Sequence, residues 1–367
     1  MEENLPEVEL QEFETLQEFA KIAREKLDQN AWDYLFGAAE TETTCRRNRQ
    51  ALDTMAFRPR VLRQVEQVNV STEFLGVKLR LPVVLAPIGS MQDFHSDAGA
   101  APTKAAAEYG CLHMLSSVCA PGLETVAAAA PDYPKIFQLY VRGDSEFVDD
   151  HVKRAIDNGY IAFAFTIDLD YYSRRERDLA KRYVTTGRRL AGYNEEHQKR
   201  FNWDDVKRVQ DKFDIPIILK GIATAEDALI AVENGIEVVY VSNHGGRQLD
   251  HGRGALDVLP EVVAAVAGKA KIMLDGGIMR GADVVKAMAL GADAVGMGRF
   301  QGMAVAAGGA SGLVRALEIL ESEVRAALGM LGVTSYAELD SSYLYPGANE
   351  VRDPHVLSCF PLIEEGY

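Results

Sequence analysis

Four short apolar runs in the second half of the chain decide the fold. They are IPIILKG (215–221), IEVVYVSN (236–243), KIMLDGG (271–277) and DAVGMGR (293–299). Each run is rich in Val, Ile and Leu without regular polar alternation, which is typical of strands buried on both faces of a parallel sheet. Helix patterns such as TAEDALIAVENG lie between the runs and end in Gly. The same alternation extends upstream through LPVVLAP (81–87), CLHMLSS (111–117), KIFQLYV (135–141) and IAFAFTID (161–168).

Eight strand–helix units within about 220 residues predict an α/β fold, a (β/α)8 TIM barrel. A doubly wound open sheet is the alternative, because the strand pattern alone does not close a barrel. Reactive or small residues follow the strands, as in SNHGG and LDGG, and barrel enzymes build their sites at those strand ends. We therefore expect a catalytic barrel over 81–332. An N-terminal helical segment with a hairpin cover is expected over 1–80, and a C-terminal extension over 333–367.

The composition limits the kinds of partner. The chain has 367 residues, 47% of them hydrophobic and 25% charged, with a net charge of −15 and no block rich in Lys and Arg. This balance argues against nucleic acid or an anionic membrane surface as the main partner, so a negatively charged substrate needs local positive groups. The four cysteines have no CxxC spacing, the charge-free stretches are too short to span a bilayer, and the N-terminus is acidic. These features predict a reduced, cytoplasmic setting without membrane attachment.

The segment SNHGGRQLD places His244 and Arg247 directly after a predicted strand. Gly245 and Gly246 allow the backbone to turn sharply, so both side chains can face the mouth of the barrel. A histidine there can act as a base near neutral pH, and the planar fork of an arginine suits a carboxylate. A structural histidine in a strand-end loop is the alternative reading.

The connection over 169–203 is long for a compact domain and carries seven Lys or Arg residues between Arg174 and Arg189. Such connections are often functional lids, here with turns expected at Gly187 and Gly192. Arg174 or Arg175 can supply the second half of a carboxylate clamp, although a solvated, salt-bridged face explains either of them singly. Asp168, at the end of IAFAFTID, either orients a protonated His244 or caps a loop.

Lys220 ends a predicted strand, with its ammonium group at the top of the barrel. Three readings compete: a buried ion pair, a Schiff-base lysine, and a cation facing an electron-rich ring. The Gly-rich segments LDGGIMRGAD and GMGR follow the last two strands and each opens a helix. Barrels commonly bind phosphate there, with Arg280 and Arg299 near enough to complement the charge.

These segments, above all SNHGGRQLD and LDGGIMRG, resemble the FMN-dependent α-hydroxy acid oxidases and dehydrogenases over about residues 31–344. The resemblance implies that His244 is the active-site base, Asp168 its carboxylate partner, and Tyr140 a hydroxyl that touches substrate or developing charge. It implies further that Arg175 and Arg247 grip the substrate carboxylate and that Lys220 lies beside the flavin. The other FMN contacts it implies are Pro87, Ile88, Gly89, Ser116, Gln138, Thr166 and Ser242 around the ring, and Asp275, Gly276, Gly277, Ile278, Met279, Arg280, Gly298 and Arg299 around the phosphate.

Four positions depart from the family pattern. Trp32 stands where a tyrosine is usual, so we expect its N–H, rather than a hydroxyl, to face the substrate. Val118 replaces a common aromatic residue and should leave room for a bulkier substrate. Met279 replaces an arginine of the phosphate loop and can contribute only its backbone. Gly89 stands in place of alanine, where it can admit water or alter oxygen access.

The reaction implied is oxidation of an α-hydroxy acid to the α-keto acid, with two electrons passing to FMN and on to oxygen, a quinone or a cytochrome. His244 takes either the α-proton or the hydroxyl proton, and the sequence leaves both routes open. The resemblance also implies a homotetramer. The alternatives are a relative with a non-standard substrate such as a modified peptide or an amine-like group, a flavin-free phosphate-binding lyase or isomerase using Lys220, and a flavin-binding scaffold without turnover.

Overall fold

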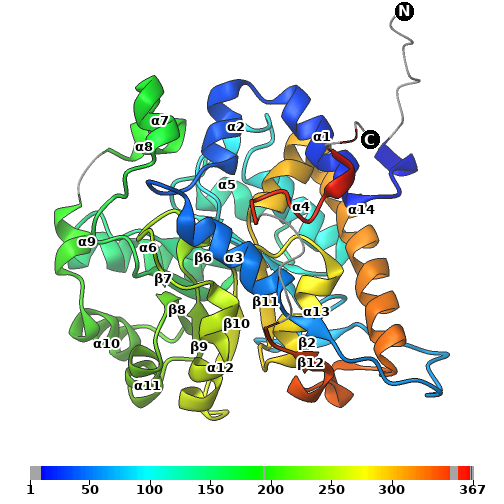
Figure 1. Cartoon of the computed structure of the whole chain (residues 1–367). Helices are drawn as coiled ribbons and strands as arrows, with labels where there is room; N and C mark the ends of the chain where they lie inside the picture. Colours follow the sequence, from blue (N-terminus) through cyan, green and yellow to red (C-terminus); the bar gives the residue numbers. More distant parts are fainter. Residues whose placement is uncertain (1–9, 193–194, 348–353, 364, 366–367) are drawn as a thin grey trace, which may run out of the picture.

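The computed structural model of the chain describes residues 10–192, 195–347, 354–363 and 365. Eight parallel strands in this part of the chain close into a barrel, in the order β10-β11-β4-β5-β6-β7-β8-β9 (Figure 1). They are β4 (Val83–Leu85), β5 (Leu112–Ser116), β6 (Lys135–Leu139), β7 (Tyr160–Thr166), β8 (Ile217–Ile222), β9 (Val238–Val241), β10 (Lys271–Leu274) and β11 (Ala294–Met297). Each lies within or overlaps one of the eight predicted runs, so the TIM barrel is confirmed and the open sheet is wrong.

The floor of the barrel is closed by the antiparallel hairpin of β2 (Thr72–Phe74) and β3 (Val77–Leu79). Phe74 and Leu79 belong to the same buried cluster as the inward-facing strand residues, which include Met114 and Tyr240. The hairpin therefore supplies apolar side chains that continue the layered packing of the barrel interior. This leaves the opposite end, where the strands finish, as the end that holds a cavity.

A helix follows each barrel strand. The eight are α4 (Ala100–Tyr109), α5 (Leu123–Ala128), α6 (Ser145–Asp157), α10 (Trp203–Lys212), α11 (Ala225–Glu233), α12 (Ala255–Val266), α13 (Gly281–Ala289) and α14 (Arg299–Leu331). Several begin where a polar side chain accepts from free backbone N–H groups. Asp144 accepts from Glu146 and Phe147 at α6, and Thr224 accepts from Asp227 at α11.

The last helix, α14, is broken at Gly308 and Gly309, where the backbone leaves the helical range. By length and composition it is apolar enough to cross a membrane, but 67% of its most apolar window is buried within the molecule. It packs against α1 (Leu16–Lys26) and α4, so its apolar character is explained by contact with the protein core (Figure 1). Its C-terminus at Leu331 is followed by Gly332 in the left-handed conformation.

The N-terminal part forms three helices, α1, α2 (Gln29–Phe36) and α3 (Thr43–Asp53). The long connection forms three more, α7 (Glu176–Lys181), α8 (Thr186–Ala191) and α9 (Glu196–Arg200). Figure 1 shows α2, α7 and α8 at the same end of the barrel, away from β2. Near the chain end, β12 (Leu344–Tyr345) pairs with β1 (Ala56–Phe57). The N-terminal cover and the C-terminal extension are thus joined by this short two-stranded sheet.

The connection docks onto the loop that follows β4. The N–H of Thr186 and the hydroxyl of Tyr183 both donate to Asp93 (3.0 and 3.1 Å), and the N–H of Gly187 donates to Ser90 (2.9 Å). Gly187 lies inside α8, so the expected turn there is wrong. Its missing side chain instead permits close approach, because a Cβ would lie 2.2 Å from the carbonyl oxygen of Val118.

A buried ion pair joins the N-terminal helices to the barrel. Arg49 of α3 donates to both oxygens of Asp283 in α13 (3.0 and 2.6 Å), and also to the carbonyl of Gly277 (3.0 Å). Burial opposes both charges, yet the pKa of Arg49 is raised by Asp283 and that of Asp283 is lowered by Arg49. The pair therefore remains ionised and fixes the Gly-rich turn after β10.

Replacing Arg49 with methionine is expected to lower the free energy of unfolding by about 3–5 kcal/mol, because Asp283 then keeps an uncompensated buried charge. Urea unfolding followed by circular dichroism measures the change. The exposed Arg46, on the same helix, provides the control Arg46→Met, for which we expect a loss of about 1 kcal/mol or less. Equal losses in the two variants would show that the ion pair with Asp283 has no special weight.

Candidate active site

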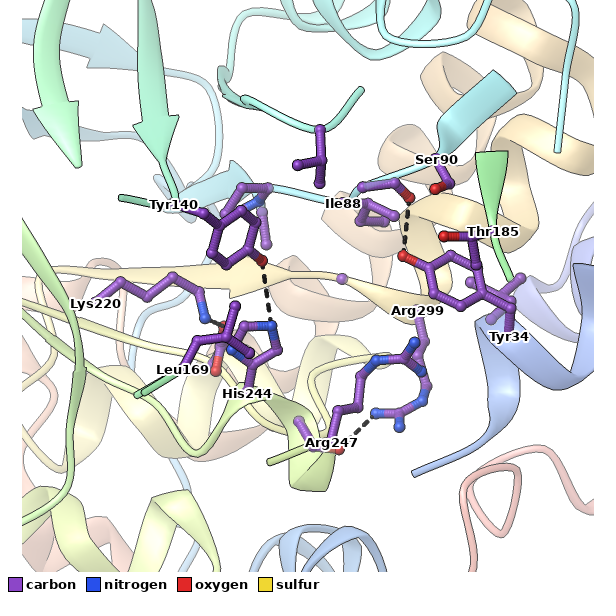
Figure 2. A pocket seen from close by; sticks show the side chains of 18 of the residues that line it. Tyr34, Ile88, Ser90, Tyr140, Leu169, Thr185, Lys220, His244, Arg247 and Arg299 are labelled. Carbon is purple, nitrogen blue, oxygen red and sulfur yellow. Dashed lines mark hydrogen bonds and ion pairs between the residues drawn. The ribbon is translucent and has the colours of Figure 1, made fainter. Parts of the chain in front are cut away.

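A cavity opens at the C-terminal ends of the barrel strands and extends beneath the connection of α7 to α9 (Figure 2). Most of the residues predicted for the site line it. These are Pro87, Ile88, Gly89, Tyr140, Arg175, Lys220, His244, Arg247, Asp275, Gly276, Gly277, Ile278, Met279, Gly298 and Arg299. The lining thus brings together residues predicted for the cofactor and residues predicted for the substrate.

His244 is held from both sides of its ring. Its Nδ1 lies 3.0 Å from Asp168 Oδ1. Its Nε2 lies 3.3 Å from the hydroxyl of Tyr140, as Figure 2 shows. The carboxylate accepts from Nδ1–H, which leaves Nε2 as the lone-pair nitrogen turned toward the cavity. The arrangement matches that of a general base with an orienting carboxylate.

The turn that carries His244 has a left-handed backbone at three consecutive residues. The φ angles are 57° at His244, 65° at Gly245 and 77° at Gly246. At Gly246 a Cβ would lie 2.5 Å from the backbone nitrogen of Cys45, so only glycine fits between the turn and α3. The HGG sequence therefore both exposes the imidazole and allows the N-terminal helices to pack closely.

Protonation in the buried pair follows from its surroundings. Burial lowers the pKa of His244 below its ordinary value, and the charge of Lys220 lowers it further, against the opposing effect of Asp168. Burial raises the pKa of Asp168, but His244 and Lys220 more than offset this, so the carboxyl is ionised. At neutral pH, His244 is thus a neutral base beside an anionic partner. Gly221, at φ 125°, leaves the space for Asp168, since a Cβ there would lie 2.8 Å from the Asp168 Cβ.

Two arginines, Arg175 and Arg247, line the same cavity. Arg247 has its guanidinium 4.9 Å from the ring centre of Tyr34, and its Nη1 donates to the carbonyl of Gly37 (2.7 Å). Burial, together with the neighbouring charge of Arg175, lowers the pKa of Arg247 to about 10. Arg175 is also buried, with its guanidinium 4.5 Å from the ring centre of Tyr172. Both guanidinium groups line the cavity, and within the described part of the chain neither forms an ion pair, so they are suited to bind a carboxylate.

Lys220 sits within a hydrogen-bonded network on the cavity wall. Its Nζ donates to Ser242 (3.0 Å) and lies 3.6 Å from Asp275 Oδ2. The Ser242 hydroxyl donates to Asp275 Oδ1 (2.6 Å), and the Tyr240 hydroxyl donates to Oδ2 (2.9 Å). The ion-pair reading of Lys220 is therefore correct. Because Lys220 also lines the cavity, its ammonium is available to an electron-rich ring as well.

The remaining predicted ring contacts lie buried just below the cavity. Gln138 donates through Nε2 to Thr166 (2.8 Å), and Ser116 is its neighbour across the β5–β6 pair. The Oε1 of Gln138 is buried and has no hydrogen-bond partner in the described part of the chain. A buried acceptor without a donor is costly, and a ring N–H of a bound isoalloxazine would satisfy it. Together with Lys220, this acceptor makes the residues present a good fit for FMN.

Trp32 does not reach the cavity, which corrects the expectation that it faces the substrate. Its ring stacks on Phe36, with centroids 5.5 Å apart, and the Arg24 guanidinium lies 5.3 Å from the centre of the Trp32 ring. Tyr34 lines the cavity instead and donates to the carbonyl of Gly89 (3.1 Å). Residues two apart on a helix point about 200° apart, so only one of the two aromatic residues can face inward.

Arg280 also departs from expectation, because it does not line the cavity. Its guanidinium pairs with Glu323 (2.6 Å) and donates to the carbonyl of Cys359 (2.9 Å), outside the barrel wall. The N–H groups of Arg280 and Met279 both donate to Asp283 and are not free for a phosphate. Arg299 is at the cavity, with its guanidinium donating to the carbonyls of Phe36, Gly37 and Gly245.

Gly89 lies close against Val118 and Tyr34, and the expected effect on water or oxygen access at this glycine stays a prediction. A Cβ at Gly89 would lie 2.6 Å from Val118 Cγ2 and 3.4 Å from the Tyr34 hydroxyl. Val118 does line the cavity, as the sequence pattern predicted for this position. The small residue at 89 thus serves packing between the strand end, Val118 and Tyr34.

Several lining residues were missed by the sequence reasoning. They are Arg142, Leu169, Tyr172, Thr185, Arg188, Gly192, Glu195 and Gln198, most of which come from the long connection. Arg142 had a usable signal, because it lies two residues after Tyr140 and alternation along an extended chain places both on one side. The others had none, since their position depends on how α8 and α9 fold over the barrel.

Comparison with known proteins identifies the class. A family model described as FMN-dependent dehydrogenase matches residues 23–346, and the chain belongs to this family. Glycolate oxidase 1 of Oryza sativa is 35% identical over 94% of this chain and 98% of the relative, and L-lactate oxidase of a Nostoc species is 37% identical over 89% and 97%. A crystal structure of mandelate oxidase superposes with a TM-score of 0.85 at 35% identity, covering 92% of this chain and all of the other.

The family assigns the cofactor and the reaction. The chain is an FMN-dependent oxidoreductase that acts on CH–OH donors and oxidises α-hydroxy acids. The flavin-free lyase or isomerase that would use Lys220 as a Schiff base is not favoured. The cavity described above lies at the end of the barrel where such enzymes build their sites.

Proposed function

We propose that this enzyme oxidises an α-hydroxy acid with His244 as the base and Arg175 and Arg247 as the carboxylate clamp. The observation that carries the proposal is the convergence of the His244–Asp168 pair and the two guanidinium groups on one cavity. A substrate whose carboxylate rests on the clamp presents its α-carbon to His244 Nε2. Holding the reacting groups in this way supplies much of the acceleration expected of such a site.

Each side chain at the site has a separate role toward the substrate. Arg175 and Arg247 bind and orient the carboxylate, and the Tyr140 hydroxyl, 3.3 Å from His244 Nε2, contacts the substrate oxygen. His244 accepts one proton from the substrate, either from the α-carbon or from the hydroxyl group. Asp168 then stabilises the imidazolium that forms. The connection of α7 to α9 limits the access of water to these groups.

Lys220, Gln138, Thr166 and the backbone at Pro87 to Gly89 would hold the ring of FMN, and Gly276, Gly277, Gly298 and Arg299 its phosphate. Bound FMN supplies the acceptor for the two electrons that leave the substrate. A positive charge from Lys220 next to the ring favours an electron-rich state of that ring. The relatives named glycolate oxidase and L-lactate oxidase support oxygen as the final acceptor.

Anaerobic mixing of the FMN-loaded enzyme with a panel of α-hydroxy acids tests the proposal. We expect the visible flavin absorption to bleach and to return on admission of air, with hydrogen peroxide formed. Bleaching without recovery in air would show that the acceptor is a quinone or a cytochrome. No bleaching with any member of the panel would leave a flavin-binding scaffold and defeat the proposal.

The pH dependence of kcat/KM reports the protonation of His244. Its pKa is lowered, so the imidazole stays neutral to a more acidic pH than an exposed histidine would. We therefore expect kcat/KM to fall on acidification with an apparent pKa below the ordinary value of about 6.5.

Replacing Asp168 with asparagine is expected to shift this acid limb to still lower pH, because the carboxylate raises the pKa of His244. The plateau should drop by about 10²–10⁴-fold, since the imidazolium loses its partner. Steady-state assays between about pH 4.5 and 8 measure both effects. An acid limb above 6.5, or a shift of the limb to higher pH in the variant, would contradict the assignment of His244.

We also propose that the enzyme is a cytoplasmic homotetramer. The free state of all four cysteines supports a reducing compartment, and the resemblance to the family supports the assembly. Light scattering coupled to size-exclusion chromatography tests the assembly, and fractionation of cells expressing the full chain tests the location.

A further inference from the structure

A second group of positive side chains lies in the cavity beyond the carboxylate clamp. Arg142 follows β6, two residues after Tyr140, and its guanidinium lies 5.9 Å from the centre of the Tyr140 ring. Arg188 of α8 lies 3.8 Å from the centre of the Tyr172 ring. We call Arg142 and Arg188 the distal arginines. Because Arg175 lies against the same Tyr172 ring as Arg188, the distal arginines lie next to the carboxylate clamp.

Among the residues that the structure describes, Arg142 forms no ion pair. Its Nη1 is buried and makes no hydrogen bond within the described residues. Burial lowers the pKa of Arg142, and the charge of Arg188 lowers it further, so the two guanidinium groups repel each other in a poorly hydrated space. The other groups that act on Arg142 are the hydroxyls of Tyr140 and Tyr172, and no carboxylate is among them. Arg142 is only half-buried as a residue, but a buried guanidinium nitrogen without a partner is costly and fits a site built for an anion.

The charge balance of the cavity gives an independent reason. The described lining has six cations, Arg142, Arg175, Arg188, Lys220, Arg247 and Arg299, and two carboxylates, Asp275 and Glu195. Asp275 is engaged by Lys220, while Glu195 accepts from the Tyr172 N–H (3.2 Å) and lies 3.7 Å from Lys199. The lining is therefore richer in cations than in carboxylates.

Resting on the function proposed above, we propose that the substrate is an α-hydroxy acid with a second anionic group on its side chain, bound by Arg142 and Arg188. The planar guanidinium groups suit a carboxylate or a sulfonate. The first carboxylate rests on Arg175 and Arg247, the α-carbon faces His244, and the side chain extends past Tyr140. Arg188 is part of α8, so a second anion bound to it also draws α8 onto the cavity.

A matched pair of substrates tests the proposal with the FMN-loaded enzyme. 2-Hydroxyglutarate and 2-hydroxypentanoate have the same number of carbons and differ in the terminal carboxylate. We expect kcat/KM to be about 10–100-fold higher for the dianion in the unaltered enzyme, as for one charge-assisted hydrogen-bonded contact. Malate and 3-sulfolactate, assayed beside 2-hydroxybutanoate, tell whether a carboxylate or a sulfonate is preferred.

Replacing Arg142 with leucine should remove most of this preference and leave kcat/KM for 2-hydroxypentanoate within about threefold. Arg188→Gln serves as a second variant that does not disturb the barrel strands. The exposed Arg189 gives the control Arg189→Leu, for which both substrates should be unaffected. Calorimetric titration with 2-oxoglutarate and 2-oxopentanoate should show the same selective loss in binding, independently of turnover.

The outcomes separate the two proposals. If monoanionic hydroxy acids bleach the flavin as well as or better than the dianions, the second-anion site is wrong while the oxidase function stands. If both arginine variants lower kcat/KM equally for the two substrates, these arginines only stabilise the connection of α7 to α9. The inference is then overturned. If no hydroxy acid of either kind bleaches the flavin, the proposed function fails together with it.

Discussion

Replacing His244 with glutamine is expected to lower kcat by about 10²–10⁴-fold for every substrate that bleaches the flavin, because glutamine has no basic nitrogen to accept the proton. Glutamine can still donate and accept hydrogen bonds at the position between Asp168 and Tyr140. The loss therefore reports proton transfer rather than collapse of the site. Stopped-flow measurement of anaerobic flavin bleaching gives the rate of the step directly.

Two measurements keep this result interpretable. The flavin content and visible spectrum of His244→Gln should match those of the unaltered enzyme, because His244 lies beside the cofactor and does not hold its phosphate. His251→Gln, on the exposed side of the same loop, should retain full activity. Rapid bleaching in the His244 variant would show that another group takes the proton. Loss of FMN from that variant would mean that the fall in rate measures cofactor binding instead.

The barrel was predictable from the sequence because its strands are buried on both faces. Such strands form continuous apolar runs that need no knowledge of partners, and each of the eight runs overlaps an observed strand. The HGGR turn was predictable for a related reason. Its glycines mark a backbone that other residues rarely adopt, and the structure has three successive positive φ angles there.

Residues whose direction depends on tertiary packing were predicted less well. Trp32 and Tyr34 lie on one helix, and only the contact of α2 with the barrel decides which ring faces the cavity. Arg280 begins α13 and is turned away from the cavity by Glu323, which lies far along the chain in α14. Neither choice is visible in the local sequence, because each depends on a partner from a distant segment.

The roles of the arginines in the long connection were also not predictable from the local sequence. Arg174, Arg175 and Arg188 come from one basic stretch, and charge alone does not separate them. In the structure Arg174 is exposed, Arg175 is buried in the clamp, and Arg188 contacts Tyr172. The net charge of −15 is therefore a property of the outer surface, whereas the cavity is strongly positive.

Replacing Arg247 with leucine is expected to lower kcat/KM by about 10²–10³-fold, the range for removing one partner of a buried, hydrogen-bonded charge pair. Most of this fall in kcat/KM should come from a higher KM, because the clamp binds the carboxylate before and during the reaction. Steady-state kinetics with a monoanionic substrate measures this loss without involvement of Arg142. The exposed neighbour of the clamp supplies the control Arg174→Leu, which should leave both constants unchanged.

Arg247→Lys distinguishes charge from geometry at this position. Lysine restores the positive charge but not the planar fork, so it should recover binding only in part and leave kcat below that of the unaltered enzyme. Arg247 also donates to the Gly37 carbonyl, and lysine can keep one such bond, which limits any effect on the packing of α2. Full recovery by lysine would mean that charge alone attracts the substrate. An unchanged KM in the leucine variant would place the substrate carboxylate elsewhere in the cavity.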